Sequence, residues 1–268
     1  MIDEKKLLKD LDSMYQYYDK DGCAVSADKL ILRLSDVKAL ICKQDMIVTP
    51  PTFPIVGQTT KPIVTTWEDI KRAAIAGNLK ELLKSGDVLP LKLSNGDTVD
   101  LVVGYDPSGK AYFIFKNAMS DRHVMNKEWT NEGGYAGSDM ARYADEEVFN
   151  MLPDYIRAII EPTKIVQVWG GERRETEHKL FCLSYTQVFG YDEDFEEQEP
   201  EDEQIDIFKN PLARVKMRCG ASSASWWWLR SAYITNSFSS VSSDGSYYNY
   251  SAYTSGAVVL GFCIEPNQ

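Results

Sequence analysis

The pattern of hydrophobic and polar positions divides the chain into three parts. Residues 1–50 place leucine, methionine and tyrosine at the three- and four-residue spacing of amphipathic helices, beginning with LLKDLDSMYQYY. Residues 51–65 are rich in proline and threonine, and proline lacks the N–H group that a helix requires, so we expect an extended connector. Residues 66–268 mix helical and strand-like periods. The chain is therefore predicted to hold a short helical N-terminal region, a connector and one α+β domain.

Within residues 66–268 the pattern predicts short elements joined by long loops. The stretch WEDIKRAAIAGNLKELLKSGD predicts a helix with a glycine-containing turn, and YAGSDMARYADEEVFNMLPDYIRAII a second helical region broken at Pro153. Between them, alternating apolar positions around Asn95-Gly96 and Ser108-Gly109 predict antiparallel strands with hairpin turns. KIVQVWG, KLFCLSYTQVFG and the apolar AVVLGFCI are predicted strands.

The charge is unevenly distributed. The formal net charge is -11, but residues 192–206 (DEDFEEQEPEDEQID) hold ten acidic residues and no basic one, so the rest of the chain carries only -1. We interpret 192–206 as a solvated, flexible loop. The acidic balance argues against nucleic-acid binding. Because no apolar run approaches the length of a membrane helix, we expect no membrane insertion, and the charged N-terminus predicts no signal peptide.

Motifs for catalysis or metal binding are not found. There is no nucleophile elbow, phosphate-binding loop or paired-histidine zinc motif, and the chain has two histidines. The cysteines are odd in number, lack CxxC spacing, and are expected to be reduced and mostly buried: Cys23, Cys42, Cys182, Cys219 and Cys263. We therefore expect no catalytic residue, no cofactor and no metal site.

Residues 233–255 (YITNSFSSVSSDGSYYNYSAYTS) have the composition of a binding surface. Tyrosine gives a large, rigid contact area and serine gives adaptable hydrogen bonding, as in antibody paratopes, whereas a serine-rich linker would not carry five tyrosines. Buried anchors are expected at Phe238, Val241, Gly245 and Ala252. The residues between them are expected to face solvent together and to bind ligand: Tyr233, Ile234, Thr235, Ser237, Ser239, Ser240, Ser242, Ser243, Tyr247, Tyr248, Tyr250, Ser251, Tyr253, Thr254 and Ser255.

The flanks of this segment are expected to belong to the scaffold. We assign WWW at 226–228 and the strand at 258–264 to the core. Arg230 is expected to pair with a carboxylate or with backbone carbonyls beneath the surface.

The ordered set WWWLRSA, a serine- and tyrosine-rich segment and GAVVLGFCI resembles the variable proteins of diversity-generating retroelements. WEDIKRAAIAGN, SGDVLPLKLSNGDTVDLVV and KLFCLSYTQVFG resemble a related uncharacterised domain family of gut bacteria and their phages, and together the motifs span about 66–266. The resemblance implies a C-type-lectin-like fold of the formylglycine-generating-enzyme type, with short antiparallel strands, two helices and long loops. It also implies that the final segment is diversified by adenine-directed copying of a template and binds ligand, mostly protein, without calcium.

The codon chemistry of that process agrees with the sequence. Asn codons randomised at both adenines never encode Lys, Glu, Gln, Met or Trp, and 233–255 contains none of these five.

We therefore expect a non-enzymatic receptor-binding protein displayed on a phage virion, associated with the tail, that binds a protein on a bacterial surface. A host-encoded copy would instead act in the cytoplasm or at the cell surface. The N-terminal region is a candidate for homo-oligomerisation.

Two alternatives stay open. A calcium-dependent lectin is suggested by Glu265-Pro266-Asn267, the tripeptide with which sugar-binding C-type lectins ligate calcium, although its usual Trp-Asn-Asp partner is missing. An oxidase-like enzyme on the same frame would need a reactive cysteine pair, which these cysteine positions do not resemble.

Overall fold

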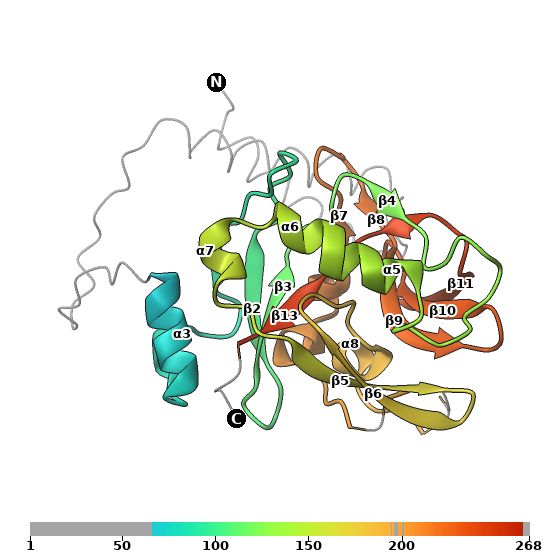
Figure 1. Ribbon diagram of the computed structural model, residues 1–268, viewed down its shortest axis with the longest axis horizontal. Helices are drawn as coiled ribbons and strands as arrows, with labels where there is room; N and C mark the ends of the chain where they lie inside the picture. The colour runs from blue at the N-terminus through green and yellow to red at the C-terminus, as the bar shows by residue number, and fades with distance from the viewer. Residues whose placement is uncertain (1–65, 194, 196–197, 200, 265–268) are drawn as a thin grey trace, which may run out of the picture. The chain divides into compact units, whose positions relative to one another are not determined.

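The computed structural model describes residues 66–193, 195, 198–199 and 201–264, which form an α+β arrangement of short helices and mostly antiparallel sheets (Figure 1). The helical region predicted over 1–50, the connector predicted over 51–65 and the tripeptide at 265–267 lie outside the described residues. Among the described residues no helix is long and apolar enough to cross a membrane.

The helical segments are short. They are α3 (Trp67–Ile75), α4 (Leu79–Leu82), α5 (Asp139–Arg142), the π-helical η1 (Tyr143–Val148), α6 (Phe149–Met151), α7 (Asp154–Arg157), α8 (Tyr185–Phe189) and the 3₁₀ segments η2 (Asp206–Lys209) and η3 (Pro211–Arg214).

The strands are equally short. They are β1 (Val88–Leu89), β2 (Leu101–Tyr105), β3 (Ala111–Phe115), β4 (Arg122–His123), β5 (Thr163–Trp169), β6 (Glu172–His178), β7 (Lys216–Met217), β8 (Ala224–Ser225), β9 (Trp227–Tyr233), β10 (Ser237–Val241), β11 (Tyr247–Ser251), β12 (Gly256–Ala257) and β13 (Gly261–Cys263).

The first helix begins and ends where its sequence predicts. Thr66 and Asp69 form a capping box at the start of α3, in which each residue satisfies a backbone N–H group of the other. The chain leaves α3 through Gly77, whose φ of +72° favours glycine, and re-enters helix as α4. The predicted helix with a glycine-containing turn is confirmed.

One sheet joins the beginning of the described domain to its end. Its order is β1-β2-β3-β13, so β13 lies beside β3 although the two are far apart in sequence (Figure 1). The predicted hairpin between β2 and β3 is confirmed, and its turn is held by Asp106, whose carboxylate accepts hydrogen bonds from the N–H groups of Gly109 (2.9 Å) and Lys110 (3.0 Å). Phe113 and Phe262 stack at 5.2 Å between ring centroids within the core.

The second helical region is interrupted where proline predicts. Ser138 caps α5, which continues through η1 and α6, and the helix ends at Leu152, directly before Pro153. Asp145, in the π-helical turn, accepts hydrogen bonds from the N–H groups of Lys179 (2.8 Å) and Leu180 (3.1 Å). This contact fixes the helical region against the chain that follows β6.

The strand predicted over KLFCLSYTQVFG is wrong: its first half forms an isolated bridge between Phe181 and Gly261, and its second half forms α8. Ser184 accepts from the N–H of Gln187 (3.1 Å), and the Gln187 side chain accepts from the N–H of Ser184 (3.0 Å), which is a capping box. This local signal outweighs the apolar alternation. Strand β6 was not predicted, because its sequence ERRETEH carries charged residues on both faces of an exposed two-stranded ribbon.

The other large sheet has the order β11-β10-β9-β12-β4 and carries residues 233–255. Trp227, Trp228 and the whole of 258–264 are buried, as expected, while Trp226 is half-buried against the core. β11 lies at the edge of this sheet.

Candidate ligand-binding surface

Residues 237–251 form the β10–β11 hairpin. Ser237 pairs with Ser251 and Val241 with Tyr247, in antiparallel register. The turn between them needs a glycine at 245, because its φ is +88° and a Cβ atom there would lie 3.0 Å from the Pro211 carbonyl oxygen. The expected anchors are confirmed as buried positions: Phe238, Val241, Gly245 and Ala252.

The three serines expected to face solvent from β10 do not. Ser237, Ser239 and Ser240 are buried, because β10 is an inner strand paired with β9 on one side and β11 on the other, and both of its faces are covered. A serine in a polar segment normally indicates exposure. Here the small side chain is what fits beneath the neighbouring residues. The predicted common solvent face is therefore wrong at these three positions.

The tyrosines divide between the two faces of the hairpin. Tyr247 contacts the rings of Tyr185 (5.2 Å) and Phe195 (5.4 Å), and Tyr233 stacks on Phe195 at 5.9 Å. Because Tyr248 alternates with Tyr247 along the strand, it points to the opposite face. The expectation that all of the tyrosines share one surface is therefore wrong.

On that opposite face the rings form a stack. Tyr250 lies 4.1 Å from Trp226 and 6.3 Å from Trp228, and Tyr248 lies 4.9 Å from Tyr250. Tyr250 is half-buried in this stack, whereas Tyr248 is 53% exposed. Of the pair, Tyr248 is the residue whose ring is free to contact a ligand.

The exposed residues of 233–255 gather mainly at the segment's two ends. The exposed members are Ile234, Thr235, Ser243, Tyr248, Tyr253 and Ser255, and the half-exposed members of the predicted set are Tyr233, Ser242, Tyr247, Tyr250, Ser251 and Thr254.

The loop at 125–132 brings those two ends together. The N–H groups of Met125 and Asn126 donate to the carbonyl of Ala252 at 2.9 and 3.0 Å, and the N–H of Asn131 donates to the carbonyl of Thr235 at 3.4 Å. The loop also presents Trp129, which is 64% exposed. Sequence reasoning missed Trp129, and the available signal was a single tryptophan in an otherwise polar stretch, KEWTNEGG.

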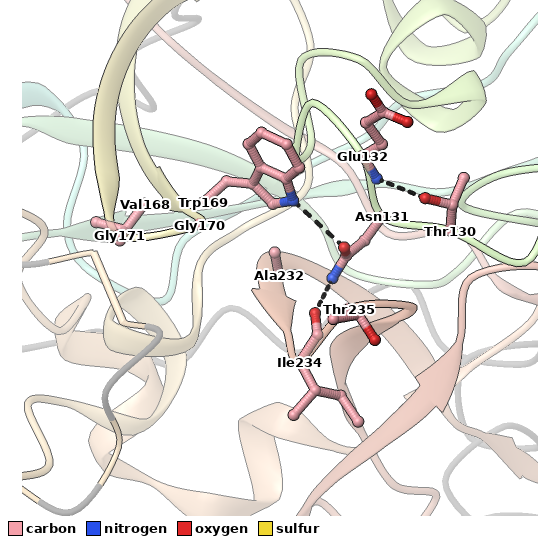
Figure 2. A pocket seen from close by; sticks show the side chains of 10 residues that line it. All are labelled: Thr130, Asn131, Glu132, Val168, Trp169, Gly170, Gly171, Ala232, Ile234 and Thr235. Carbon is pink, nitrogen blue, oxygen red and sulfur yellow. Dashed lines mark hydrogen bonds between the residues drawn. The ribbon is translucent and has the colours of Figure 1, made fainter.

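A pocket of about 530 Å³ opens beside the β9–β10 turn. Ile234 and Thr235 line one side, Thr130 and Glu132 another, and the β5–β6 turn with Trp169 a third (Figure 2). The pocket therefore combines two predicted ligand-binding residues with residues from parts of the chain that the prediction did not include. Such partly apolar hollows with a few polar groups are where ligands bind.

Asn131 is the support of this pocket. Its side chain is buried and donates to the carbonyls of Ile234 and Ser237 (3.0 Å for the latter), while its amide oxygen accepts from the indole N–H of Trp169 at 3.3 Å (Figure 2). One side chain thus ties the β9–β10 turn to the β5 strand, so the pocket walls are held in fixed positions.

Ile234 has an unusual backbone conformation. Its φ is +44°, in the left-handed region, and its side chain is 57% exposed. A β-branched residue rarely adopts this conformation, because its side chain crowds the backbone, whereas asparagine and glycine adopt it readily. Strain of this kind persists only where the surroundings enforce it, and here the hydrogen bond from Asn131 to the Ile234 carbonyl does so.

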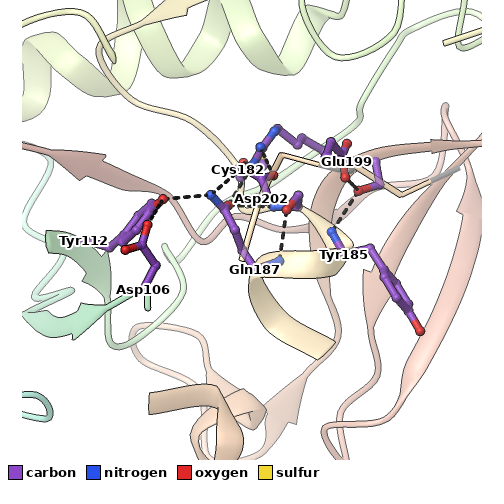
Figure 3. A network of polar contacts seen from close by, with 10 residues as sticks. Asp106, Tyr112, Cys182, Tyr185, Gln187, Glu199 and Asp202 are labelled. Atoms are coloured by element: carbon purple, nitrogen blue, oxygen red, sulfur yellow. Dashed lines mark hydrogen bonds and ion pairs between the residues drawn. The ribbon is translucent and has the colours of Figure 1, made fainter. Parts of the chain in front are cut away.

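The expected pairing of Arg230 is confirmed. The buried guanidinium forms an ion pair with Asp202 and donates to the side-chain oxygen of Gln187 at 2.8 Å and to the carbonyl of Cys182 at 3.4 Å. Figure 3 shows this network, which extends from Gln187 to the hydroxyl of Tyr112 (3.4 Å). It fixes β9 to α8 beneath the hairpin.

Glu199 lies in the same network. Its carboxylate accepts from the hydroxyl of Ser231 at 2.5 Å, and that hydroxyl in turn accepts from the N–H of Tyr185 at 2.8 Å. Complete burial, with a smaller contribution from Asp202 and against the attraction of Arg230, raises the pKa of Glu199 to about 7.

The interpretation of 192–206 as a solvated loop is wrong for several described residues of that segment. Phe195, Gln198, Glu199 and Ile205 are buried, and Asp202 pairs with Arg230. An acidic run normally stays in water because charge is costly to bury. Here a buried arginine compensates the charge, and the apolar Phe195 and Ile205 within the run pack against the domain.

The described cysteines form no disulfide. Cys182 and Cys263 are buried and Cys219 is half-buried, as expected for reduced structural cysteines. Burial raises the pKa of Cys182 to about 12, so it is not a thiolate nucleophile at neutral pH. Among the residues that the structure describes, no three His, Cys, Asp or Glu side chains are grouped so that they could hold a metal ion.

Comparison with known protein families matches a large part of the chain. The model of a family described as a domain of unknown function, DUF6273, matches residues 109–266, which is more than half of the chain and includes the whole of 233–255. No curated protein and no solved structure matches. The chain therefore belongs to the DUF6273 family.

Proposed function

We propose that this chain is a non-enzymatic ligand-binding protein whose segment 233–255 is diversified by a retroelement on a C-type-lectin-like frame. The observation that carries the proposal is the separation of roles within the segment. Its apolar anchors Phe238, Val241 and Ala252 are fully buried, whereas most of its exposed side chains lie at two turns that flank one loop. A surface of this kind tolerates substitution because its side chains add little to the core.

The frame is consistent with the proposed fold. Its antiparallel strands are short, its two helical regions are separate, and its connections are long. One sheet joins the first strands of the domain to the last, and another carries the hairpin. The rigid part thus lies beneath the exposed turns, which is the arrangement that a changing binding surface requires.

The conformation of Ile234 supports diversification. The residue best suited to a φ of +44° is asparagine or glycine. An asparagine codon becomes an isoleucine codon when its second adenine is replaced by thymine, which is the type of change that adenine-directed copying introduces. The strained isoleucine is therefore what this process would leave at a position whose template residue is asparagine.

The proposed ligand is a protein on a bacterial surface, bound by a virion-displayed, tail-associated form of this chain. The exposed rings and aliphatic groups of Trp129, Ile234, Tyr248 and Tyr253 supply the contacts, since large amphipathic side chains dominate protein interfaces. Tyr247 and Tyr250 pack against scaffold rings and contribute mainly to stability.

Sequencing the 3′ end of this gene across its native population tests the proposal. We expect codons for Ile234, Thr235, Tyr248 and Tyr253 to vary at positions where the template has adenine. Codons for residues 226–231 and 258–264, which belong to the scaffold, are the internal control and should be constant. An invariant 233–255 segment, or variation spread equally over the control codons, would refute diversification.

A binding experiment tests the function independently of the mechanism that produces the diversity. Variants at the exposed side chains, Trp129→Ala and Tyr253→Ala, should lose capture of bacterial cells by the full chain while retaining the wild-type melting temperature. Lys209→Ala, an exposed change outside the surface, is the matched control. Equal capture by all three variants would refute the assignment of this surface.

A further inference from the structure

A second pocket, of about 570 Å³, lies between β2, η3 and β7. None of its lining residues belongs to 233–255, so it is separate from the proposed binding surface. Four of its lining side chains carry nitrogen donors, and several others are aliphatic. The pocket therefore has the two chemical characters that an amphipathic small molecule requires.

Lys216 lies at the pocket and is almost completely buried, with only 4% of the residue exposed. Its ammonium group makes no hydrogen bond or ion pair with any described residue, and it lies over the ring of Phe208, 5.7 Å from the ring centroid. Buried lysines are normally paired, because an isolated buried charge is strongly unfavourable. Lys216 therefore lacks the counter-charge that its position calls for.

Lys116 and Asn117 line the same pocket. Lys116 forms no ion pair with a described residue, and the side-chain amide of half-buried Asn117 makes no hydrogen bond with one. Burial, and secondly the positive charge of Lys116, lower the pKa of Lys216 to about 8. An anion placed between the two lysines would remove this repulsion.

The acidic residue of the pocket does not neutralise the lysines. Asp206 accepts hydrogen bonds from the N–H of Tyr105 (2.9 Å) and the hydroxyl of Ser85 (2.8 Å), and it forms no ion pair with Lys116 or Lys216. Its carboxylate is already used to fix β2 to η2. The ammonium groups of Lys116 and Lys216 therefore have no ion-pair partner among the described residues.

The remaining walls are aliphatic. Val88 is 43% exposed, Leu212 is 77% exposed, and Val102 is half-buried, all as lining residues of the pocket. Exposed aliphatic side chains beside a buried cation suit a ligand with a hydrocarbon part and one negative group. A compact inorganic anion would leave these side chains in water.

We propose that this pocket binds a small aliphatic carboxylate, whose carboxylate pairs with Lys216 and Lys116 and whose hydrocarbon part packs on Val88, Val102 and Leu212. Asn117 donates the remaining hydrogen bond. This site does not depend on the proposed function of 233–255.

The pocket predicts an unusual pH dependence. Carboxylate binding requires an ionised ligand and a protonated Lys216, so affinity should be full at about pH 6 to 7 and should decline as pH rises through about 8, where Lys216 loses its proton. A site built on ordinary surface lysines would keep its affinity to about pH 10.

Isothermal titration calorimetry of the full chain with butyrate, acetate and phosphate tests the proposal. We expect butyrate to bind with a Kd on the order of 1 mM at pH 6.5 and more tightly than acetate or phosphate. Lys216→Met should weaken butyrate binding about tenfold or more, as expected for loss of a charge-assisted hydrogen bond. Lys209→Met, which removes an exposed lysine that does not line the pocket, should bind as the wild type does.

Folding does not confound this test, because replacing a buried, unpaired lysine by methionine is expected to stabilise the chain. Lys216→Arg provides a second check: it keeps its charge at high pH, so any butyrate binding that it retains should not decline near pH 8. Butyrate affinity that is equal in wild type and Lys216→Met would overturn the proposal, as would no butyrate binding at pH 6.5. Phosphate binding as tight as butyrate would overturn the assignment to an aliphatic carboxylate.

Discussion

The side-chain amide of Asn131 donates a hydrogen bond to the backbone carbonyl of Ile234, 103 residues further along the chain. The same amide also donates to the carbonyl of Ser237 at 3.0 Å. A buried polar group from the loop at 125–132 thus fixes the turn at which the chain takes its left-handed conformation. The turn can hold isoleucine, which is unsuited to this conformation, because the hydrogen bond that enforces the conformation comes from Asn131, outside the turn.

Ile234→Asn should increase the free energy of unfolding by about 1 kcal/mol, because the left-handed conformation costs a β-branched residue about that much more than asparagine. Urea unfolding followed by tryptophan fluorescence measures the change. Thr235→Asn, the exposed neighbour without a positive φ, is the control and should be neutral. A destabilised Ile234→Asn variant would show that the conformation is not strained.

Asn131→Asp should decrease the free energy of unfolding by about 2–3 kcal/mol at neutral pH. Aspartate has nearly the same shape but cannot donate, so the carbonyls of Ile234 and Ser237 lose their donor beside a buried negative charge. Trp169→Phe removes only the bond in which Asn131 accepts, and should cost less. If Trp169→Phe were the more harmful change, packing of the indole rather than the amide would hold the turn.

The sequence predicted the elements whose signals are local. Pro153 and the Ser108-Gly109 turn act on the residues beside them, and the break and the hairpin occur where they were expected. At Asn95-Gly96 the chain forms an isolated bridge between Lys92 and Thr98 in place of the expected paired strands. α8 was missed because its capping box was not weighed against the apolar alternation of the same residues.

The surface was predicted only in part, because exposure depends on strand position and on distant residues. Nothing in the sequence of β10 shows that it lies between two strands, so its serines were taken as exposed. Nothing beside Asp202 shows that it reaches the buried Arg230, 28 residues further along the chain. Arg230 itself was predicted to find such a partner, because a buried arginine must.

Ser240→Ala should increase the free energy of unfolding by up to about 1 kcal/mol. The Ser240 hydroxyl is fully buried opposite Trp228 and Tyr248 and has no hydrogen-bond partner among the described residues. Removing it therefore removes a desolvation cost without breaking a bond. Thermal denaturation of Ser240→Ala and of the exposed control Ser243→Ala distinguishes burial from a general effect of serine removal. A marked loss of stability only in Ser240→Ala would indicate that the hydroxyl is bonded.

Replacing tyrosines by alanine should separate stability from binding. Tyr247→Ala should cost about 2–4 kcal/mol, because its ring packs against Tyr185, Phe189 and Phe195. Tyr253→Ala, whose ring is 55% exposed, should change stability by less than about 1 kcal/mol. Chemical denaturation measures both, and equal costs would contradict the division of the tyrosines between packed and exposed positions.

Glu199 should give the chain a pH-dependent stability that Glu199→Gln removes. Its folded pKa of about 7 lies above the value of about 4.5 for a free glutamate, so its folded carboxyl binds more protons than its unfolded carboxyl between these values. The corresponding contribution to stability is full below about pH 4.5 and is lost as pH rises through about 7. Relative to the wild type, Glu199→Gln should therefore become more stable as pH rises from 4.5 to 8, by on the order of 2–3 kcal/mol.

Complete burial is the main cause of the raised pKa of Glu199, and the balance of charge around Arg230 adds to it. The buried Arg230 already forms an ion pair with Asp202, so an ionised Glu199 would be a second negative charge beside one positive charge. Protonation of Glu199, on the carboxyl oxygen that does not bond to Ser231, removes this second negative charge. Asp202→Asn should reverse this balance by leaving Glu199 as the counter-ion of Arg230, which lowers the pKa of Glu199. Urea unfolding at pH 5, 6, 7 and 8 for the wild type, Glu199→Gln, Asp202→Asn and the double variant measures this coupling. In the Asp202→Asn background, the pH range over which Glu199→Gln changes the free energy of unfolding should move to lower pH. If that range does not move, burial alone, without Asp202, sets the protonation of Glu199.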